Sequence, residues 1–71
     1  MSGRSDANIP FQDMRRLLKR LGFLEHIKGD HHVFRKPGLA EIINLQPEGD
    51  KAKAYQVRQV RGIIGKYGLD Q

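Results

Sequence analysis

Apolar residues change their spacing twice along this 71-residue chain, and that change limits the chain to a mixed fold of helices and strands. Towards both ends they recur every three or four positions, as on one side of an amphipathic helix. Gly22 and Gly68 follow the two segments and predict where each helix ends. The sequence therefore predicts a first helix that has Pro10 in its first turn and ends before Gly22, and a second over about residues 53–67. The apolar positions are Phe11, Met14, Leu17, Leu18 and Leu21 in the first helix, and Val57, Val60, Ile63, Ile64 and Tyr67 in the second.

Between the helices the helical spacing gives way to three short runs, separated by two dipeptides. Gly29-Asp30 and Pro37-Gly38 both favour tight turns. The runs are predicted to form three antiparallel strands, and they cover residues 23–28, 31–36 and 39–45.

The segment from Gln46 to Ala52 contains Pro47, Gly49 and Asp50, and it is predicted to be a loop. Two helices and three strands bury their apolar sides when both helices pack on one face of the sheet. We therefore expect an α+β sandwich of order helix, three strands, helix, with the other face of the sheet open. Residues 1–7 are small and polar, which predicts a disordered N-terminal tail before a single domain over residues 8–71.

Composition and charge narrow the classes of partner. With 38% hydrophobic residues and no Cys, the core is small, and we expect a partner chain to add stability. Thirteen Lys and Arg against eight acidic residues give a net charge of +5, which attracts polyanions such as RNA. Three histidines without zinc-motif spacing predict no metal and no other cofactor. No apolar run reaches the length of a membrane span, so we expect a cytoplasmic protein without membrane contact.

The segment from Lys28 to Lys36 carries the chemistry of a candidate site, because it places His31 and His32 directly after a glycine turn. An imidazole both accepts and donates protons near neutral pH. A glycine lets backbone N–H groups approach a ligand closely. Asp30 is most simply a turn residue, but beside an imidazole its carboxylate would favour the protonated ring.

Strand alternation predicts which histidine is available, because residues two apart on a strand share a face. If Phe34 is buried, His32 lies in the core with it and His31 lies on the open face. If Val33 is buried instead, His32 and Phe34 are exposed together. We favour the first arrangement, since burying Phe removes more apolar area from water. His26 has no turn or cation cluster beside it and is expected to be an ordinary surface histidine.

From about Phe11 to Leu69 the chain resembles the HicA toxins of bacterial type II toxin–antitoxin systems. The end of the first helix, the glycine-histidine segment and the C-terminal segment carry the resemblance. They read Leu21-Gly22-Phe23, Gly29-Asp30-His31-His32-Val33-Phe34 and Arg61-Gly62-Ile63-Ile64-Gly65-Lys66-Tyr67-Gly68-Leu69. A subgroup of the family is also similar in Asn44-Leu45-Gln46-Pro47 and in residues 52–61.

The resemblance implies a fold like that of double-stranded-RNA-binding domains and a metal-independent endoribonuclease that cleaves mRNA. It also implies inhibition by a HicB-type antitoxin protein that covers the active histidine. The usual glycine-serine-histidine motif of the family corresponds to Gly29, Asp30 and His31, so Asp30 stands where a serine is usual. Its carboxylate repels phosphate and lacks a hydroxyl donor. Many relatives also carry a proline-histidine pair where this chain has Gln46-Pro47.

In such an enzyme, neutral His31 would take the proton from a ribose 2′-OH, which attacks the adjacent phosphorus. His32 is the candidate for a second proton transfer, provided that it reaches the same side of the strand. The groups expected to stabilise the phosphorane oxygens are Lys28, Arg35, Lys36 and the N–H groups of Gly29 and Asp30.

A second group of cations accompanies the second helix, and an aromatic residue and two amides lie between them. These residues are Lys51, Lys53, Arg58 and Arg61, with Tyr55, Gln56 and Gln59. They either grip a phosphate backbone or form an ordinary solvated surface. The alternative function is a non-catalytic RNA-binding module of the same fold, which reads the shape of an A-form helix. A protein-interaction domain for an acidic partner is a third possibility.

Overall fold

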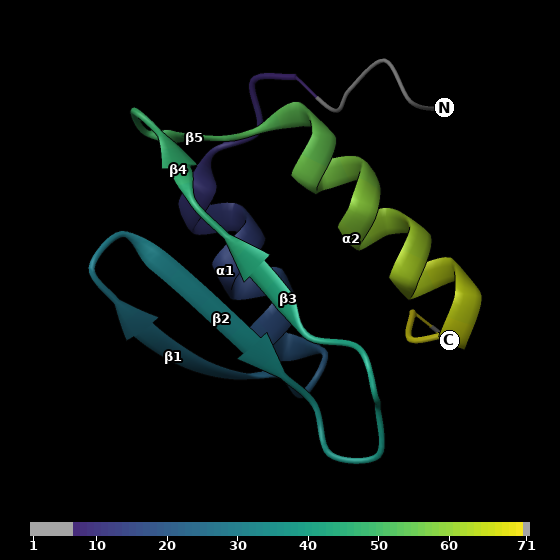
Figure 1. The fold of residues 1–71 in the computed structure, drawn as a ribbon. Coiled ribbons are helices and arrows are strands. Elements are labelled where there is room, and N and C mark those ends of the chain that lie inside the picture. The colour runs from purple at the N-terminus through teal and green to yellow at the C-terminus, as the bar shows by residue number, and fades with distance from the viewer. Residues whose placement is uncertain (1–6, 71) are drawn as a thin grey trace.

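The computed structural model describes residues 7–70, which form two helices, a three-stranded antiparallel sheet and a small two-stranded hairpin (Figure 1). In chain order the elements are α1 (Phe11–Arg20), β1 (Leu24–Lys28), β2 (His31–Arg35), β3 (Ile43–Leu45), β4 (Pro47–Glu48), β5 (Lys51–Ala52) and α2 (Ala54–Tyr67). The predicted disordered tail, residues 1–7, lies outside the described residues except for Ala7, which is exposed in a turn.

The first helix buries three of its five predicted apolar residues and ends at the predicted glycine, whereas Leu17 is 36% exposed and Leu21 is only partly buried. Phe11, Met14 and Leu18 are buried in the core. Gly22 has a φ of 99°, and the next N–H, that of Phe23, donates a 2.9 Å hydrogen bond to the carbonyl of Leu18. This left-handed ending returns the chain towards the sheet and places Phe23 in the core.

The order of the main sheet is β1-β2-β3, with both pairs antiparallel. Phe34 is fully buried, so its face of β2 is the inner one, as the alternation argument predicts. The third strand is shorter than predicted: only residues 43–45 pair with β2, whereas residues 39–42 form a loop. Leu39 packs against the core and Ile42 is half exposed, so burial still alternates over residues 39–45 as in a strand. What residues 39–42 lack is the backbone pairing with β2.

The prediction of a loop over residues 46–52 is wrong, because this segment forms the β4–β5 hairpin around a turn at Gly49. The hairpin also pairs with the start of the chain. The N–H of Ala52 donates a 2.8 Å hydrogen bond to the carbonyl of Ile9, and the N–H of Phe11 donates one of 2.9 Å to the carbonyl of Asp50. These bonds join the segment before α1 to the segment before α2.

The second helix begins after Lys53 and buries Val57, Val60 and Ile63. It ends at Gly68, which has a φ of 61°. Tyr67 is more exposed than its position in the predicted apolar set implies, and its hydroxyl donates a 2.8 Å hydrogen bond to Glu41.

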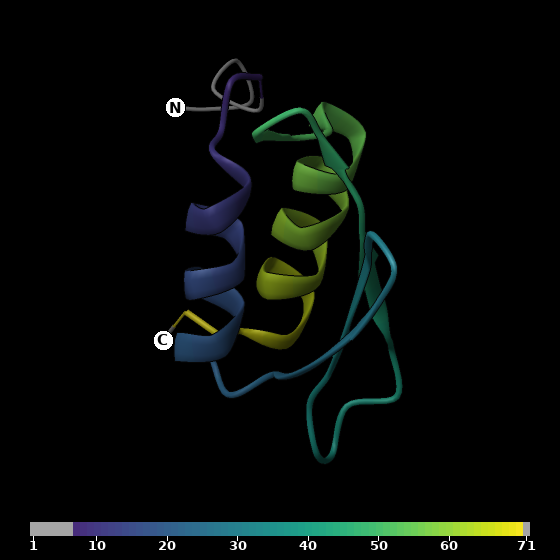
Figure 2. The same ribbon diagram turned by 90° about the vertical axis from the view of Figure 1, so that its left-hand side faces the viewer.

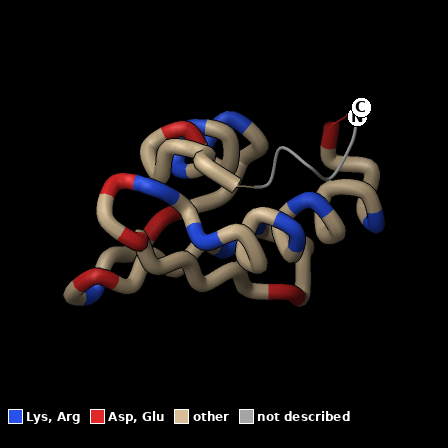
Figure 3. The backbone as a smooth tube through the Cα atoms, turned by 90° about the horizontal axis from the view of Figure 1, so that it is seen from above, with Lys and Arg blue, Asp and Glu red and all other residues tan. Residues whose placement is uncertain are grey.

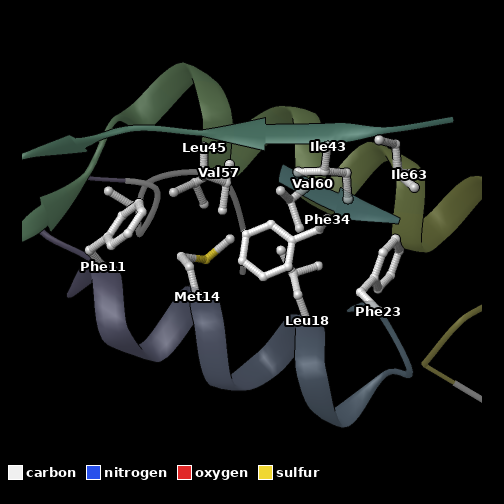
Figure 4. Close-up of a cluster of buried hydrophobic side chains, with 11 residues drawn as sticks. Phe11, Met14, Leu18, Phe23, Phe34, Ile43, Leu45, Val57, Val60 and Ile63 are labelled. Carbon is white, nitrogen blue, oxygen red and sulfur yellow. The ribbon is translucent and has the colours of Figure 1, made fainter. Parts of the chain in front are cut away.

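Both helices lie side by side on the inner face of the sheet, and no described element covers the other face (Figures 1 and 2). The core fills the space between these layers, with Phe34 in its middle, next to Met14 and Leu18 of α1 (Figure 4). The molecule is thus a small α+β protein of the expected order, extended by the hairpin. Neither described helix has the length and apolar character needed to cross a membrane.

Candidate functional site

The open face of the main sheet carries His31 at the first position of β2. Its side chain is 52% exposed, and the strand register places Lys28 of β1 directly opposite it. Side chains opposite each other on one face of an antiparallel pair lie close together. The Gly29-Asp30 turn connects these two positions, and Gly29 has a φ of 61°, which glycine adopts without strain.

Two side chains contact the imidazole of His31. Its Nδ1 lies 3.3 Å from Oδ1 of Asn44 on the neighbouring strand, and its Nε2 lies 3.8 Å from Oδ1 of Asp30. When Nδ1–H donates to Asn44, the lone pair of Nε2 is left free to accept a proton. The strand β3 therefore orients the ring from one side and the turn from the other.

Asp30 is held in place by groups from beyond the turn. Nε2 of Gln46 donates a 2.8 Å hydrogen bond to its Oδ2. This bond, the backbone N–H of Asp30 and the nearby charges of His31 and Lys53 hold the pKa of the Asp30 carboxyl below its usual value. Asp30 is consequently an anion at neutral pH, with the cation of Lys53 close enough to offset part of its charge.

A shallow hollow of about 310 Å³ lies beside His31, between β3 and the first turns of α2. We refer to it as the amide pocket, because four of its lining side chains carry an amide group. It is lined by His31, Ile42, Asn44, Gln46, Tyr55, Gln56 and Gln59.

Gln56 is buried, with 6% of the residue exposed, and it joins the two walls of the amide pocket. Its Oε1 accepts a 3.2 Å hydrogen bond from the N–H of Gln46, and its Nε2 donates one of 3.3 Å to the carbonyl of Asn44. Because Asn44 lies in β3 and Gln46 follows that strand directly, Gln56 fixes the start of α2 against the end of the sheet.

His32 lies on the inner face, away from this group. Its Nδ1 is 2.7 Å from Oε2 of Glu25, and its ring meets the ring of Phe11 edge to face with centroids 4.8 Å apart. Arg15 donates two hydrogen bonds to the same carboxylate, and Lys19 lies 2.9 Å from it. The hydrogen bonds from Arg15, His32 and Lys19 hold the pKa of Glu25 well below its usual value despite burial. His32 therefore belongs to a packed ionic network that connects α1 to the sheet.

The remaining predicted site residues divide by position. Arg35 is exposed on the open face, but four residues along β2 place it about 13 Å from His31. Lys36 lies apart, since its Nζ donates a 2.9 Å hydrogen bond to the carbonyl of Leu21 at the end of α1. Arg58 is exposed on α2, whereas Arg61 lines a groove between the two helices, together with Leu17.

Basic residues lie along both helices in the view of Figure 3, whereas several acidic residues lie in the turns. The predicted cation cluster of the second helix is thus spread over different surfaces, and Lys53 is the member whose charge acts on Asp30. Sequence reasoning missed that Asn44 and Gln46 contact the Gly29–His31 segment. It also missed that Tyr55 and Gln59 face His31 across a pocket. The three- to four-residue spacing of positions 55, 56 and 59 on one side of α2 is the signal that could have shown this.

No family model matches the chain, and no curated protein or solved structure matches it either. Among residues 7–70, no three His, Asp or Glu side chains are grouped so that they could hold a metal ion.

Proposed function

We propose that this protein is an endoribonuclease of the HicA type and that His31 is its general base. The observation that carries the proposal is the half-exposed imidazole of His31, whose Nδ1 contacts Asn44 and whose Nε2 lies beside the glycine turn, 3.8 Å from Asp30. An RNA-binding protein that reads only shape needs cations and has no use for an oriented imidazole.

The proposed reaction uses His31, the RNA and one water molecule. Nε2 of neutral His31 takes the proton of a ribose 2′-OH, and the 2′ oxygen forms a bond to the adjacent phosphorus. The bond from phosphorus to the 5′ oxygen of the next nucleotide breaks, and water protonates that oxygen. The products are a 2′,3′-cyclic phosphate and a free 5′-OH.

Lys28 and Lys53 supply positive charge on the two sides of the turn, where the negative charge of the phosphorane develops. The N–H groups of the Gly29-Asp30 turn are further donors. Asp30 works against this arrangement through its own charge, but the hydrogen bond from Gln46 and the charge of Lys53 offset part of the repulsion.

The proposal extends to the fold and to the partner. The order of two helices and three strands, with both helices on one face, is consistent with a domain like those that bind double-stranded RNA. A HicB-type antitoxin would inhibit the protein by covering His31 on the open face of the sheet, and that partner would add the stability that a small core lacks.

Cleavage of a structured mRNA by the purified protein in EDTA tests the proposal. His31→Ala should abolish cleavage and leave RNA binding nearly unchanged. The matched control is His26→Ala, which removes another exposed imidazole from the same face of the sheet. His32→Ala is a poorer test, because His32 contacts Glu25 and Phe11 in the packed network.

Loss of cleavage in His31→Ala alone, with a 2′,3′-cyclic phosphate on the product, supports the nuclease. Intact RNA with the wild type, or equal cleavage by His31→Ala, overturns it. Binding without cleavage would favour the second candidate, a non-catalytic RNA-binding module. The carboxylate of Asp30 beside the histidine is the observation that favours this alternative, because it repels a scissile phosphate.

A further inference from the structure

The amide pocket has a chemistry that the proposed cleavage reaction does not use. Proton transfer involves His31 and the turn, whereas the opposite wall consists of Tyr55 and Gln59 from α2. A volume of about 310 Å³ lies at the lower end of the range for small-ligand sites, about 300–1,000 Å³. The pocket thus offers room for one flat polar group next to the imidazole.

The walls of the pocket are held before any ligand arrives. Gln56 bonds both the N–H of Gln46 and the carbonyl of Asn44, which ties α2 to the end of β3. A site whose frame is already fixed loses little conformational entropy on binding.

The lining also presents unused binding groups. The ring of Tyr55 is 57% exposed, and Ile42 beside the same pocket is 48% exposed. Within residues 7–70, the side-chain amide of Gln59 and Nδ2 of Asn44 make no hydrogen bond to another described residue. An exposed aromatic face combined with free amide donors and acceptors suits a nucleobase, which stacks through its face and hydrogen-bonds through its edge.

We infer that the amide pocket binds one unpaired nucleobase of a single-stranded RNA, next to the phosphate that lies at His31. Tyr55 stacks on the base, and Gln59 and Asn44 bond to its edge. The identity of the ligand rests on the proposed function. When a base occupies this pocket, the sugar-phosphate backbone of the same RNA strand comes within reach of Lys28 and Lys53. A base inside a duplex has neither a free face nor a free Watson–Crick edge, so the pocket selects single strands over A-form helices.

Binding is measured with the wild-type protein and a short single-stranded oligonucleotide whose riboses are 2′-O-methylated, because this RNA cannot undergo the 2′-OH attack. The same strand annealed to its complement is the second ligand. Single-strand binding should be tighter than duplex binding. Tyr55→Ala should weaken single-strand binding by about 5- to 150-fold, the range for removal of one stacked base, and leave duplex binding unchanged.

Two further variants separate stacking from general effects. Tyr55→Phe keeps the ring and should bind the single strand within about twofold of the wild type, because stacking depends on the aromatic face. Tyr67→Ala removes an exposed tyrosine about three turns further along α2, so it should not change the preference for single strands. Thermal unfolding of each variant confirms that the fold is intact.

Equal affinity for the single strand and the duplex, no RNA binding at all, or wild-type binding by Tyr55→Ala would each overturn the inference. The outcome of the cleavage assay is independent of the outcome of this binding assay. Single-strand binding that depends on Tyr55, without cleavage of unmodified RNA, would support the base-binding pocket and refute the proposed nuclease. Cleavage that requires His31 but is indifferent to Tyr55 would do the reverse.

Discussion

Glu25→Gln should destabilise the fold strongly, because the Glu25 carboxylate is the centre of the ionic network between α1 and the sheet. Its side chain is only 4% exposed. Both of its oxygens are occupied: Arg15 donates to each of them at 2.7 and 2.9 Å, and Lys19 and His32 take one each. Glutamine has nearly the same shape, but it offers one acceptor oxygen and presents an N–H₂ group to cations.

The size of this loss of stability depends on how well water can solvate each partner of Glu25 once the carboxylate is gone. Removing one partner of a buried ion pair costs about 3–5 kcal/mol when the other charge is left buried. Lys19 is half exposed and is easily solvated again, whereas Arg15 is 22% exposed and keeps part of the penalty. The ring of His32, 13% exposed, can also lose its contact with the carboxylate oxygen. We therefore expect a loss of about 2–3 kcal/mol, a large share of the stability of a domain this small.

Urea unfolding followed by circular dichroism measures this loss. At pH 7 the variant should unfold at a clearly lower urea concentration, and its Tm should fall by about 10–20 °C. The pKa of Glu25 is lower in the folded protein than its ordinary value of 4.5, so the unfolded chain takes up the proton first as the pH falls. The contribution of Glu25 is complete well above pH 4.5 and is progressively lost below it. The difference between wild type and variant should shrink accordingly.

The matched control is Glu41→Gln, which removes a partly exposed carboxylate from its contacts with Lys66 and Tyr67 and should shift the midpoint little. Equal midpoints for the wild type and Glu25→Gln at pH 7 would refute the reasoning. A difference that stays constant from pH 7 to pH 3 would show that packing, and not charge, is responsible.

Four further outcomes are expected. Phe34→Ala removes the fully buried ring at the centre of the core, which costs about 3–5 kcal/mol and should abolish the cooperative thermal transition; a melt like that of the wild type would contradict the assigned register. Asp30→Ser removes the anion beside the proposed position of the scissile phosphate and should raise the single-turnover cleavage rate, while a slower variant would mean that Asp30 orients His31 productively. Lys53→Ala should reduce the slope of log K for RNA against log salt by about one, and an unchanged slope would place the phosphate elsewhere. Gly68→Ala places a Cβ atom on a backbone with φ of 61°, which costs about 1 kcal/mol of stability when α2 ends at the same residue. Tm should fall by about 4–8 °C.

Much of the fold follows from local patterns in the sequence. The three- to four-residue spacing predicts both helices, the left-handed glycines mark their ends, and the size of Phe34 decides which face of β2 is buried. Such patterns do not predict the β4–β5 hairpin, because two-residue strands are too short to show alternation. Its partners, Ile9 and Phe11, lie about 40 residues earlier, and local spacing carries no information about them.

The candidate site is predicted in part. The glycine turn and strand alternation correctly place His31 on the open face, because both are local properties. The network around Glu25 depends on how α1 crosses the sheet, and the amide pocket depends on where α2 starts relative to β3. These are tertiary relations between residues that look unremarkable one at a time. Gln56 in particular reads as a surface residue of a polar helix and is instead buried.

The pairing of Ile9 with Ala52 has a consequence for the order in which the protein is assembled. Closing a loop of this length is slower than forming a single helix or the β1–β2 hairpin, so the segments around it are expected to join late in folding. Gln46 and Lys53 flank that junction, and Tyr55 follows it. A growing chain on the ribosome therefore exposes His31 well before any pocket exists beside it, and the site is completed only once the last third of the chain has emerged.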